Sequence, residues 1–182
     1  MDESLQSAYG KLLEAVSFAA RAHRHQIRKD GQTPYAAHVF RVCQIVRHVF
    51  GIDDPRALMA AALHDTVEDT TTDFDDLEEA FGPEVAEWAT LLCKDKRRPD
   101  DEREEAYVAR LVRAPWQVKV CKLADVFDNL LDARHLKPEQ RERTGRRARR
   151  YLEALGAALP PEARPAYDIV ERLYAELYPG KL

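Results

Sequence analysis

Apolar side chains recur every three or four residues along most of this chain, which is the period of a helix buried on one face. Residues 4–24 show the pattern and then give way to a basic, turn-rich segment, RKDGQTP. The same period predicts further helices over 34–50, 56–69, 74–80, 84–94, 106–112, 117–131, 138–157 and 161–178. The β-branched stretch VKVCKLADVF would suit a strand if taken alone, but we assign it to the 117–131 helix. We therefore expect an all-α bundle of about eight to ten helices.

Proline and glycine mark where these helices begin or end. The residues concerned are Pro34, Gly51, Pro55, Gly82, Pro83, Pro160 and Pro161. Proline suits the first turn of a helix, and glycine suits the residue just after its end. Because no repeat, low-complexity segment or linker stands out, we expect a single domain over residues 1–182, completed by the helices of 136–182.

Composition and charge narrow the class of protein. Apolar residues make up 45% of the chain and charged residues 33%, a mixture typical of amphipathic helices around one core. The net charge of -4 lacks the basic excess of a nucleic-acid-binding protein. No apolar run is long enough to cross a membrane, and the start MDESLQSAYG does not resemble a secretory signal, so we expect a cytoplasmic protein. Cys43, Cys93 and Cys121 lack metal-site spacing and are expected to be reduced core residues. The sequence does not indicate an oligomeric state.

The segment LHDTVEDT places ionisable groups at the end of a very apolar stretch: His64, Asp65, Glu68 and Asp69. On a continuous helix, residues four apart share one face, so these four side chains would lie together. Three anions this close raise one another's pKa unless a cation intervenes, and a divalent metal is the simplest counter-charge. His64 and Asp65 are therefore candidate metal ligands. The alternative is a helix end leaving the core, with His64 as a hydrogen-bonded core histidine.

Two further segments offer matching donors. Asp125 interrupts the apolar run of KLADVFDN, with Asn129 one helical turn later, and His38 begins an apolar helix. On the residues alone, Asp125 and Asn129 also suit a solvent-exposed face. Asp128 and Asp132 nearby would belong to that face, and His38 would be a packed or capping histidine. Two histidines and two aspartates from three separate helices can, however, form a mixed nitrogen and oxygen site with positions left for water and substrate.

Taken together, HRHQIRKDGQTPYAAH, LHDTVEDT and KLADVFDN resemble the hydrolase half of the RelA/SpoT homologues, and especially the small alarmone hydrolases of the HD-domain class. The resemblance covers roughly residues 15–135, with the three motifs in the same order and spacing. It implies an all-helical fold and hydrolysis of the 3′-pyrophosphate of guanosine tetra- and pentaphosphate, (p)ppGpp, the alarmones of the stringent response. It also implies a manganese ion. Its ligands would be His38, His64, Asp65 and Asp125, and the residues acting on the attacking water would be Glu68 and Asp69.

The resemblance further implies a set of nucleotide-binding residues. Arg28 and Lys29 would recognise the base, because a planar guanidinium can stack on a purine. Asn129 would hold the ribose or a phosphate, and the phosphates would also be reached by Lys96, Arg147 and Tyr151. Without the resemblance, the first stretch is a solvated basic loop, and RERTGRRARR is a solvated helix face.

Departures from the family pattern concern the substrate. Val126 stands where a basic residue is common, and Asp128 where histidine or tyrosine is common. A lost positive charge near the phosphates would weaken binding of a highly charged nucleotide. Other substrates therefore stay open, such as the 2′-phosphate of NADPH or (p)ppApp. A nucleotide-binding regulator without turnover is a further alternative, which the presence of both Glu68 and Asp69 disfavours.

Overall fold

The structure is a computed structural model that describes residues 3–97 and 99–180 of the 182-residue chain. The elements, in chain order, are α1 (Glu3–Ala22), α2 (Ala36–Gln44), the π-helix η1 (Ile45–Val49), α3 (Pro55–Leu63), α4 (Thr66–Asp69), α5 (Phe74–Phe81), α6 (Pro83–Leu92), α7 (Asp100–Arg113), α8 (Trp116–Asp132), the 3₁₀ helix η2 (Ala133–His135), α9 (Pro138–Gly156), the 3₁₀ helix η3 (Pro161–Ala163) and α10 (Arg164–Leu177). The predicted all-α class is confirmed.

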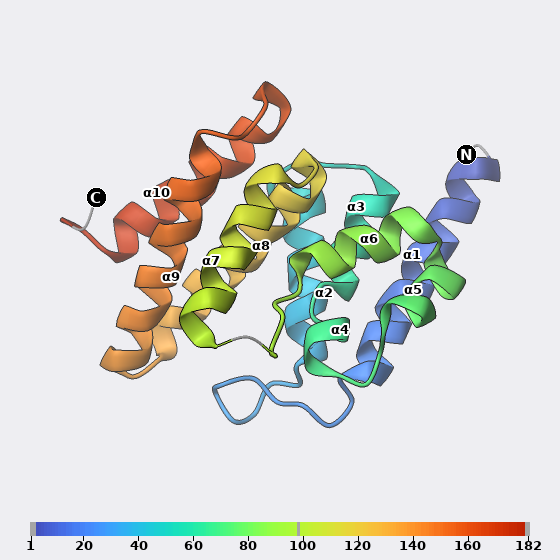
Figure 1. Ribbon diagram of the computed structural model, residues 1–182, viewed down its shortest axis with the longest axis horizontal. Helices are drawn as coiled ribbons and strands as arrows, with labels where there is room; N and C mark the ends of the chain where they lie inside the picture. Colours follow the sequence, from blue (N-terminus) through green and yellow to red (C-terminus); the bar gives the residue numbers. More distant parts are fainter. Residues whose placement is uncertain (1–2, 98, 181–182) are drawn as a thin grey trace.

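Helix α8 is the central element of the fold. It packs against α2, α3, α6, α7, α9 and α10, and most of its residues are buried. Figure 1 shows α1, α5 and α6 toward one end of the molecule and α9 and α10 toward the other, with α8 between them. The larger apolar core runs through α8 and reaches α10, while a smaller one lies among α1, α3, α5 and α6. A side chain carried by α8 is therefore positioned by the core itself.

The prediction of one helix over residues 56–69 was wrong, because α3 ends at Leu63 and α4 begins at Thr66. Asp65 between them has φ -105° and ψ -2°, away from ideal helical values. The break leaves the Leu63 carbonyl oxygen without its helical partner, and the buried Thr66 hydroxyl donates a hydrogen bond to it over 2.7 Å. His64 and Asp65 consequently occupy a turn rather than the side of a helix.

Helix α3 holds this turn firmly from its N-terminal side. Pro55 opens the helix, and the Asp54 carboxylate accepts a hydrogen bond from the Arg56 amide, as expected of an N-cap. All residues from Ala57 to Leu63 are buried. A helix enclosed on every side has little freedom to move, so it fixes the residues that follow it.

The basic segment between α1 and α2 forms a compact loop near α2 and α4 (Figure 1). Ile27 and Pro34 form an isolated antiparallel bridge, and the Arg28 amide donates to the Thr33 carbonyl oxygen over 2.8 Å. Gly31 turns the chain with φ 76°, a value that glycine adopts without strain. This closed loop presents Arg28 and Lys29 on neighbouring positions.

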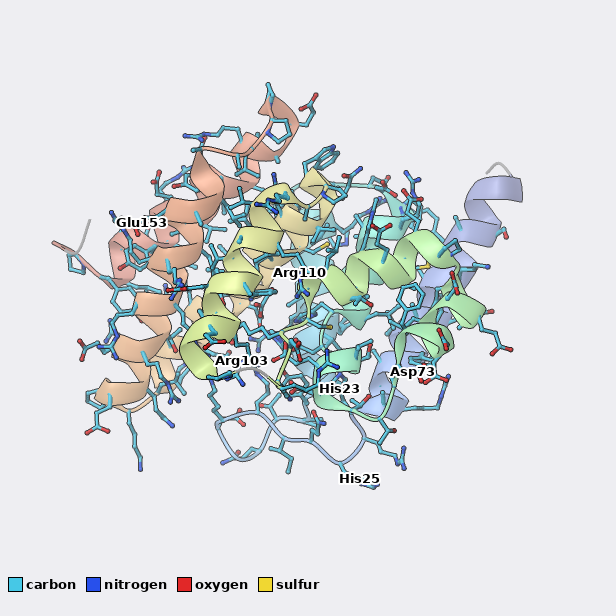
Figure 2. The ribbon with its side chains drawn as sticks, in the orientation of Figure 1. His23, His25, Asp73, Arg103, Arg110 and Glu153 are labelled. Atoms are coloured by element: carbon cyan, nitrogen blue, oxygen red, sulfur yellow. The ribbon has the colours of Figure 1, made fainter. Side chains whose placement is uncertain are left out.

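The two histidines that precede this loop lie in different surroundings. Figure 2 shows His25 at the edge of the molecule and His23 further in, and His23 is almost fully buried. The His23 ring lies 4.9 Å from that of Tyr35, between ring centres. Contacts of this kind join the loop to the start of α2.

Within the described part of the chain, no helix is long and apolar enough to cross a membrane.

Candidate metal centre and active site

The structure brings the four proposed metal ligands together: His38 from α2, His64 and Asp65 from the turn after α3, and Asp125 from α8. His38 Nε2 lies 3.3 Å from Asp125 Oδ1 and 3.6 Å from Asp65 Oδ2. His64 Nε2 lies 3.1 Å from Asp65 Oδ2 and 3.9 Å from Asp125 Oδ1. Ligand bonds of about 2.1 Å place donor atoms about 3 Å apart when adjacent around an octahedral ion and about 4 Å when opposite. The donor atoms of His38, His64 and Asp65 lie within 4.8 Å of one another, and Asp125 lies beside both imidazoles, so the group suits one divalent metal ion.

Both imidazoles are oriented by a hydrogen bond at Nδ1. The Nδ1 of His64 lies 2.8 Å from the Ala61 carbonyl oxygen, which can only accept, so this nitrogen carries the proton. His38 Nδ1 lies 2.6 Å from Asp128 Oδ2. In each ring Nε2 then faces the carboxylates. Among the described residues, the buried His64 Nε2 makes no hydrogen bond of good geometry, although Asp65 Oδ2 lies 3.1 Å away, and such an atom suits a metal.

The two carboxylates are held as firmly as the imidazoles. The Tyr35 hydroxyl donates to Asp65 Oδ2 over 2.6 Å. Asp125 Oδ2 lies 2.7 Å from the Lys122 ammonium, and Asp125 Oδ1 accepts a hydrogen bond from the Asn129 amide over 2.6 Å. These hydrogen bonds and the ion pair restrict rotation of each carboxylate and so fix where its oxygen atoms lie.

Electrostatics in the cluster favour a cation. Burial disfavours the charged form of His38, yet its hydrogen bonds to Asp125, Asp128 and Asp65 raise its pKa to about 10. Burial likewise opposes ionisation of Asp65, but the His64 and His38 rings beside it hold its pKa well below the usual value. The carboxylates thus draw positive charge onto the imidazoles, and a divalent ion satisfies the same demand.

Glu68 and Asp69 lie just beyond the cluster, on α4. Glu68 Oε2 accepts a hydrogen bond from the Lys94 amide over 2.7 Å, and burial raises the pKa of Glu68 in spite of that bond. Asp69 is anchored through its main chain, because the Gln26 side-chain amide donates to its carbonyl oxygen over 2.6 Å. Its carboxylate lies 2.5 Å from the Lys96 ammonium.

A cavity of about 230 Å³ opens onto the cluster. The predicted site residues that line it are Arg28, Lys29, His38, Asp65, Glu68, Asp69, Asp125, Asn129, Arg147 and Tyr151. Lys96 is not among the lining residues, and its partly exposed ammonium pairs with Asp69 instead. A hollow of about 90 Å³ beside the cavity shares Arg28, Lys29, Asn129 and Thr144 with it. The loop before α2 and helix α9 thus form the wall of the cavity away from the cluster.

Several predicted cavity residues also hold protein partners. The Arg28 guanidinium donates to Asp132 Oδ2 over 2.7 Å and lies 5.6 Å from the centre of the Tyr35 ring. The Tyr151 hydroxyl donates to Glu104 over 2.5 Å, and the Lys122 ammonium lies 4.4 Å from the centre of the Tyr151 ring. These contacts orient the side chains before any ligand arrives.

The structure also identifies site residues that the sequence did not. Tyr35, Lys94 and Lys122 line the cavity, and Lys122 follows from the motif KLADVFDN only through its i, i+3 spacing to Asp125. The alternative interpretation of KLADVFDN put Asp128 on a solvent-exposed face, whereas the structure buries it fully against His38. Its i, i+3 spacing to Asp125 and its departure from the family residue were the available signals.

Comparisons with known proteins agree with this geometry. The chain matches the family described as HD domain over residues 15–151. It is 43% identical over 134 residues to the guanosine-3′,5′-bis(diphosphate) 3′-pyrophosphohydrolase MESH1 of Danio rerio, covering 73% of this chain and 74% of that protein. The human MESH1 is also 43% identical over 134 residues, with 73% and 75% covered. A solved structure described as a metazoan ortholog of SpoT that hydrolyzes ppGpp has a TM-score of 0.78 at 34% identity, covering 89% of this chain and 94% of that one. The chain therefore belongs to the HD-domain family.

Proposed function

We propose that this protein is a metal-dependent phosphohydrolase that removes the 3′-pyrophosphate of (p)ppGpp. The observation that carries the proposal is the convergence of His38, His64, Asp65 and Asp125 beside a cavity whose wall bears cationic side chains. The relatives named for this reaction share 43% of residues over most of the chain, which supports the same substrate class.

We propose that these four residues are the metal ligands and that the metal is manganese. Imidazole nitrogen together with carboxylate oxygen suits manganese, iron, cobalt and zinc, and the resemblance to the alarmone hydrolases selects manganese among them. Four protein donors leave positions of a six-coordinate ion for water and substrate. A divalent cation bound here would lower the pKa of a water molecule and offset the charge of the phosphate under attack.

Glu68 would accept a proton from the attacking water. It lines the cavity, and the Lys94 amide fixes one of its carboxylate oxygens, so the other can face the water. Burial raises its pKa, which makes it a stronger base than an exposed glutamate. Asp69 lines the cavity next to it and would orient the same water.

The cationic wall suits a substrate with several phosphates. Lys29 and Arg147 line the cavity from the loop before α2 and from α9, and Lys94 lines it beside Glu68. Desolvation of its ammonium and the neighbouring guanidinium groups, Arg28 first among them, lower the pKa of Lys29. Cations crowded in this way gain from binding a polyanion, because the ligand offsets their mutual repulsion.

A substrate panel tests the proposal. The protein is loaded with manganese and incubated with ppGpp, pppGpp, pppApp and NADPH, and released pyrophosphate and phosphate are measured separately. We expect pyrophosphate from the guanosine substrates and loss of turnover in a chelator. Val126 makes the comparison informative, because it lines the cavity as an apolar residue where the family commonly has a basic one.

The other outcomes of the panel are equally specific. Phosphate release from NADPH alone would identify a 2′-phosphorylated dinucleotide, and not the alarmone, as the substrate. Tight binding of ppGpp without turnover in manganese would identify a nucleotide-binding regulator. Repeating the panel with iron, cobalt and zinc tests the choice of metal.

Three buried, unpaired cysteines (Cys43, Cys93 and Cys121) support our further proposal that the protein acts in the cytoplasm, where thiols stay reduced.

A further inference from the structure

Asp128 connects the proposed metal cluster to a group of charged residues behind it. The residue lies on α8 three positions after Asp125 and is fully buried. One carboxylate oxygen, Oδ2, lies 2.6 Å from His38 Nδ1. The other, Oδ1, accepts a hydrogen bond from Arg41 Nε over 2.5 Å. Both oxygens of this aspartate are therefore used within the protein.

We propose that Asp128 is a positioning residue that prepares His38 to bind the metal, an inference that rests on the proposed metal site. A carboxylate beside Nδ1 keeps the proton on that nitrogen and leaves the Nε2 lone pair for the ion. It also fixes the plane of the ring, so that Nε2 faces Asp125 at 3.3 Å and Asp65 at 3.6 Å. A negatively charged acceptor makes the imidazole a stronger ligand than a neutral acceptor does.

The two histidines of the cluster differ in this respect. His64 donates from Nδ1 to a main-chain carbonyl, which no side-chain substitution removes. His38 depends on a side chain, the carboxylate of Asp128. Asp128 is thus a position at which a single substitution can change how His38 is held without altering a proposed ligand.

Arg41 gives Asp128 its own support. The Arg41 guanidinium donates to Asp128 through Nε and to Asp132 through Nη2 over 2.7 Å. Arg28 approaches the same pair, at 2.7 Å from Asp132 and 3.6 Å from Asp128. Two arginines therefore offset two aspartates behind His38. Asp132 contacts the arginines but is not among the partners of His38, which makes it a matched control on the same helix.

The test measures manganese binding to the full chain by isothermal titration calorimetry, without nucleotide. Asp128→Asn keeps the shape of the side chain and loses its charge, and we expect a 10- to 100-fold weaker affinity for manganese, the usual cost of losing such a partner. Asp132→Asn should change the affinity by less than about threefold, because its partners are arginines. Saturating manganese should restore most of kcat in Asp128→Asn, while the manganese concentration for half-maximal rate stays raised.

The outcomes separate this inference from the proposed function. An unchanged manganese affinity in folded Asp128→Asn overturns the inference alone, and so does an equal loss in Asp132→Asn. A wild-type chain that does not bind manganese overturns the proposed metal site itself. Where Asp128→Asn fails to fold, Arg41→Ala takes its place, because it removes the support of Asp128 from a partly exposed position. We then expect a smaller loss in the same direction, and no loss would overturn the inference.

Discussion

The two walls of the cavity are built in different ways. The metal wall comes from α2, from the turn after α3 and from α8, and its side chains are largely buried and hydrogen-bonded to one another. The opposite wall comes from the loop before α2 and from α9, where Lys29 and Arg147 are exposed. Packing thus fixes the positions of the proposed metal ligands, whereas the exposed cations would bind the substrate. Substitutions in the two walls should change different kinetic quantities.

The largest effect is expected for Asp125→Ala on the metal wall. It removes a proposed ligand, so manganese retention should be lost and turnover should fall at least about 100-fold. It also leaves the buried Lys122 ammonium without its carboxylate at 2.7 Å, which destabilises the fold. Metal analysis and turnover of Asp125→Asn, which keeps the shape of the side chain, separate the two effects. Full turnover in either variant would contradict the role of Asp125.

The next effect is expected for Glu68→Gln, which keeps an acceptor for the Lys94 amide and removes the base. Turnover should fall by about 10²- to 10⁴-fold, the usual contribution of a general base. Manganese affinity, measured by calorimetry, should stay the same because Glu68 is not a proposed ligand. A parallel loss of metal would instead assign Glu68 to the metal cluster.

A smaller effect is expected for Arg147→Ala on the cationic wall. The KM for ppGpp should rise about tenfold while kcat stays within about threefold, because the interaction is made equally in ground state and transition state. Arg146→Ala is the control, since the neighbouring arginine pairs with Glu142 and is not among the cavity residues. A fall in kcat with unchanged KM would instead show that Arg147 stabilises the transition state.

The smallest effect is expected for Lys96→Ala. Its ammonium pairs with Asp69 at a partly exposed position, and such pairs contribute only about 0–1 kcal/mol. The value of kcat/KM should therefore fall at most about fivefold. A loss above tenfold in steady-state kinetics would support the contact between Lys96 and the phosphates that the family resemblance implies.

Much of the fold follows from local signals, because proline and glycine mark helix ends and apolar periodicity marks helix faces. The same signals fail at His64 and Asp65, where a continuous helical pattern hides a break that the buried Thr66 hydroxyl helps to stabilise. They also fail at Asp128. Polar residues at helical spacing predict a solvent face, whereas His38 and Arg41 from another helix enclose this one.

The convergence of the proposed ligands was predicted through the family resemblance, not through periodicity. Each of the three motifs is ambiguous alone, and the order and spacing of all three favoured a common site. The protein partners of Arg28 and Tyr151 could not be predicted in that way. Each partner lies on a helix that is distant in the sequence. A single sequence does not show which side chains of two such helices face each other.

The enclosure of α3 also bears on how the protein loses activity when heated. Residues Ala57 to Leu63 are buried without interruption and lead directly into His64 and Asp65. These two residues cannot separate from their neighbours unless the hydrophobic interior opens as well. Thermal inactivation should therefore coincide with cooperative melting of the whole chain, rather than precede it through local fraying.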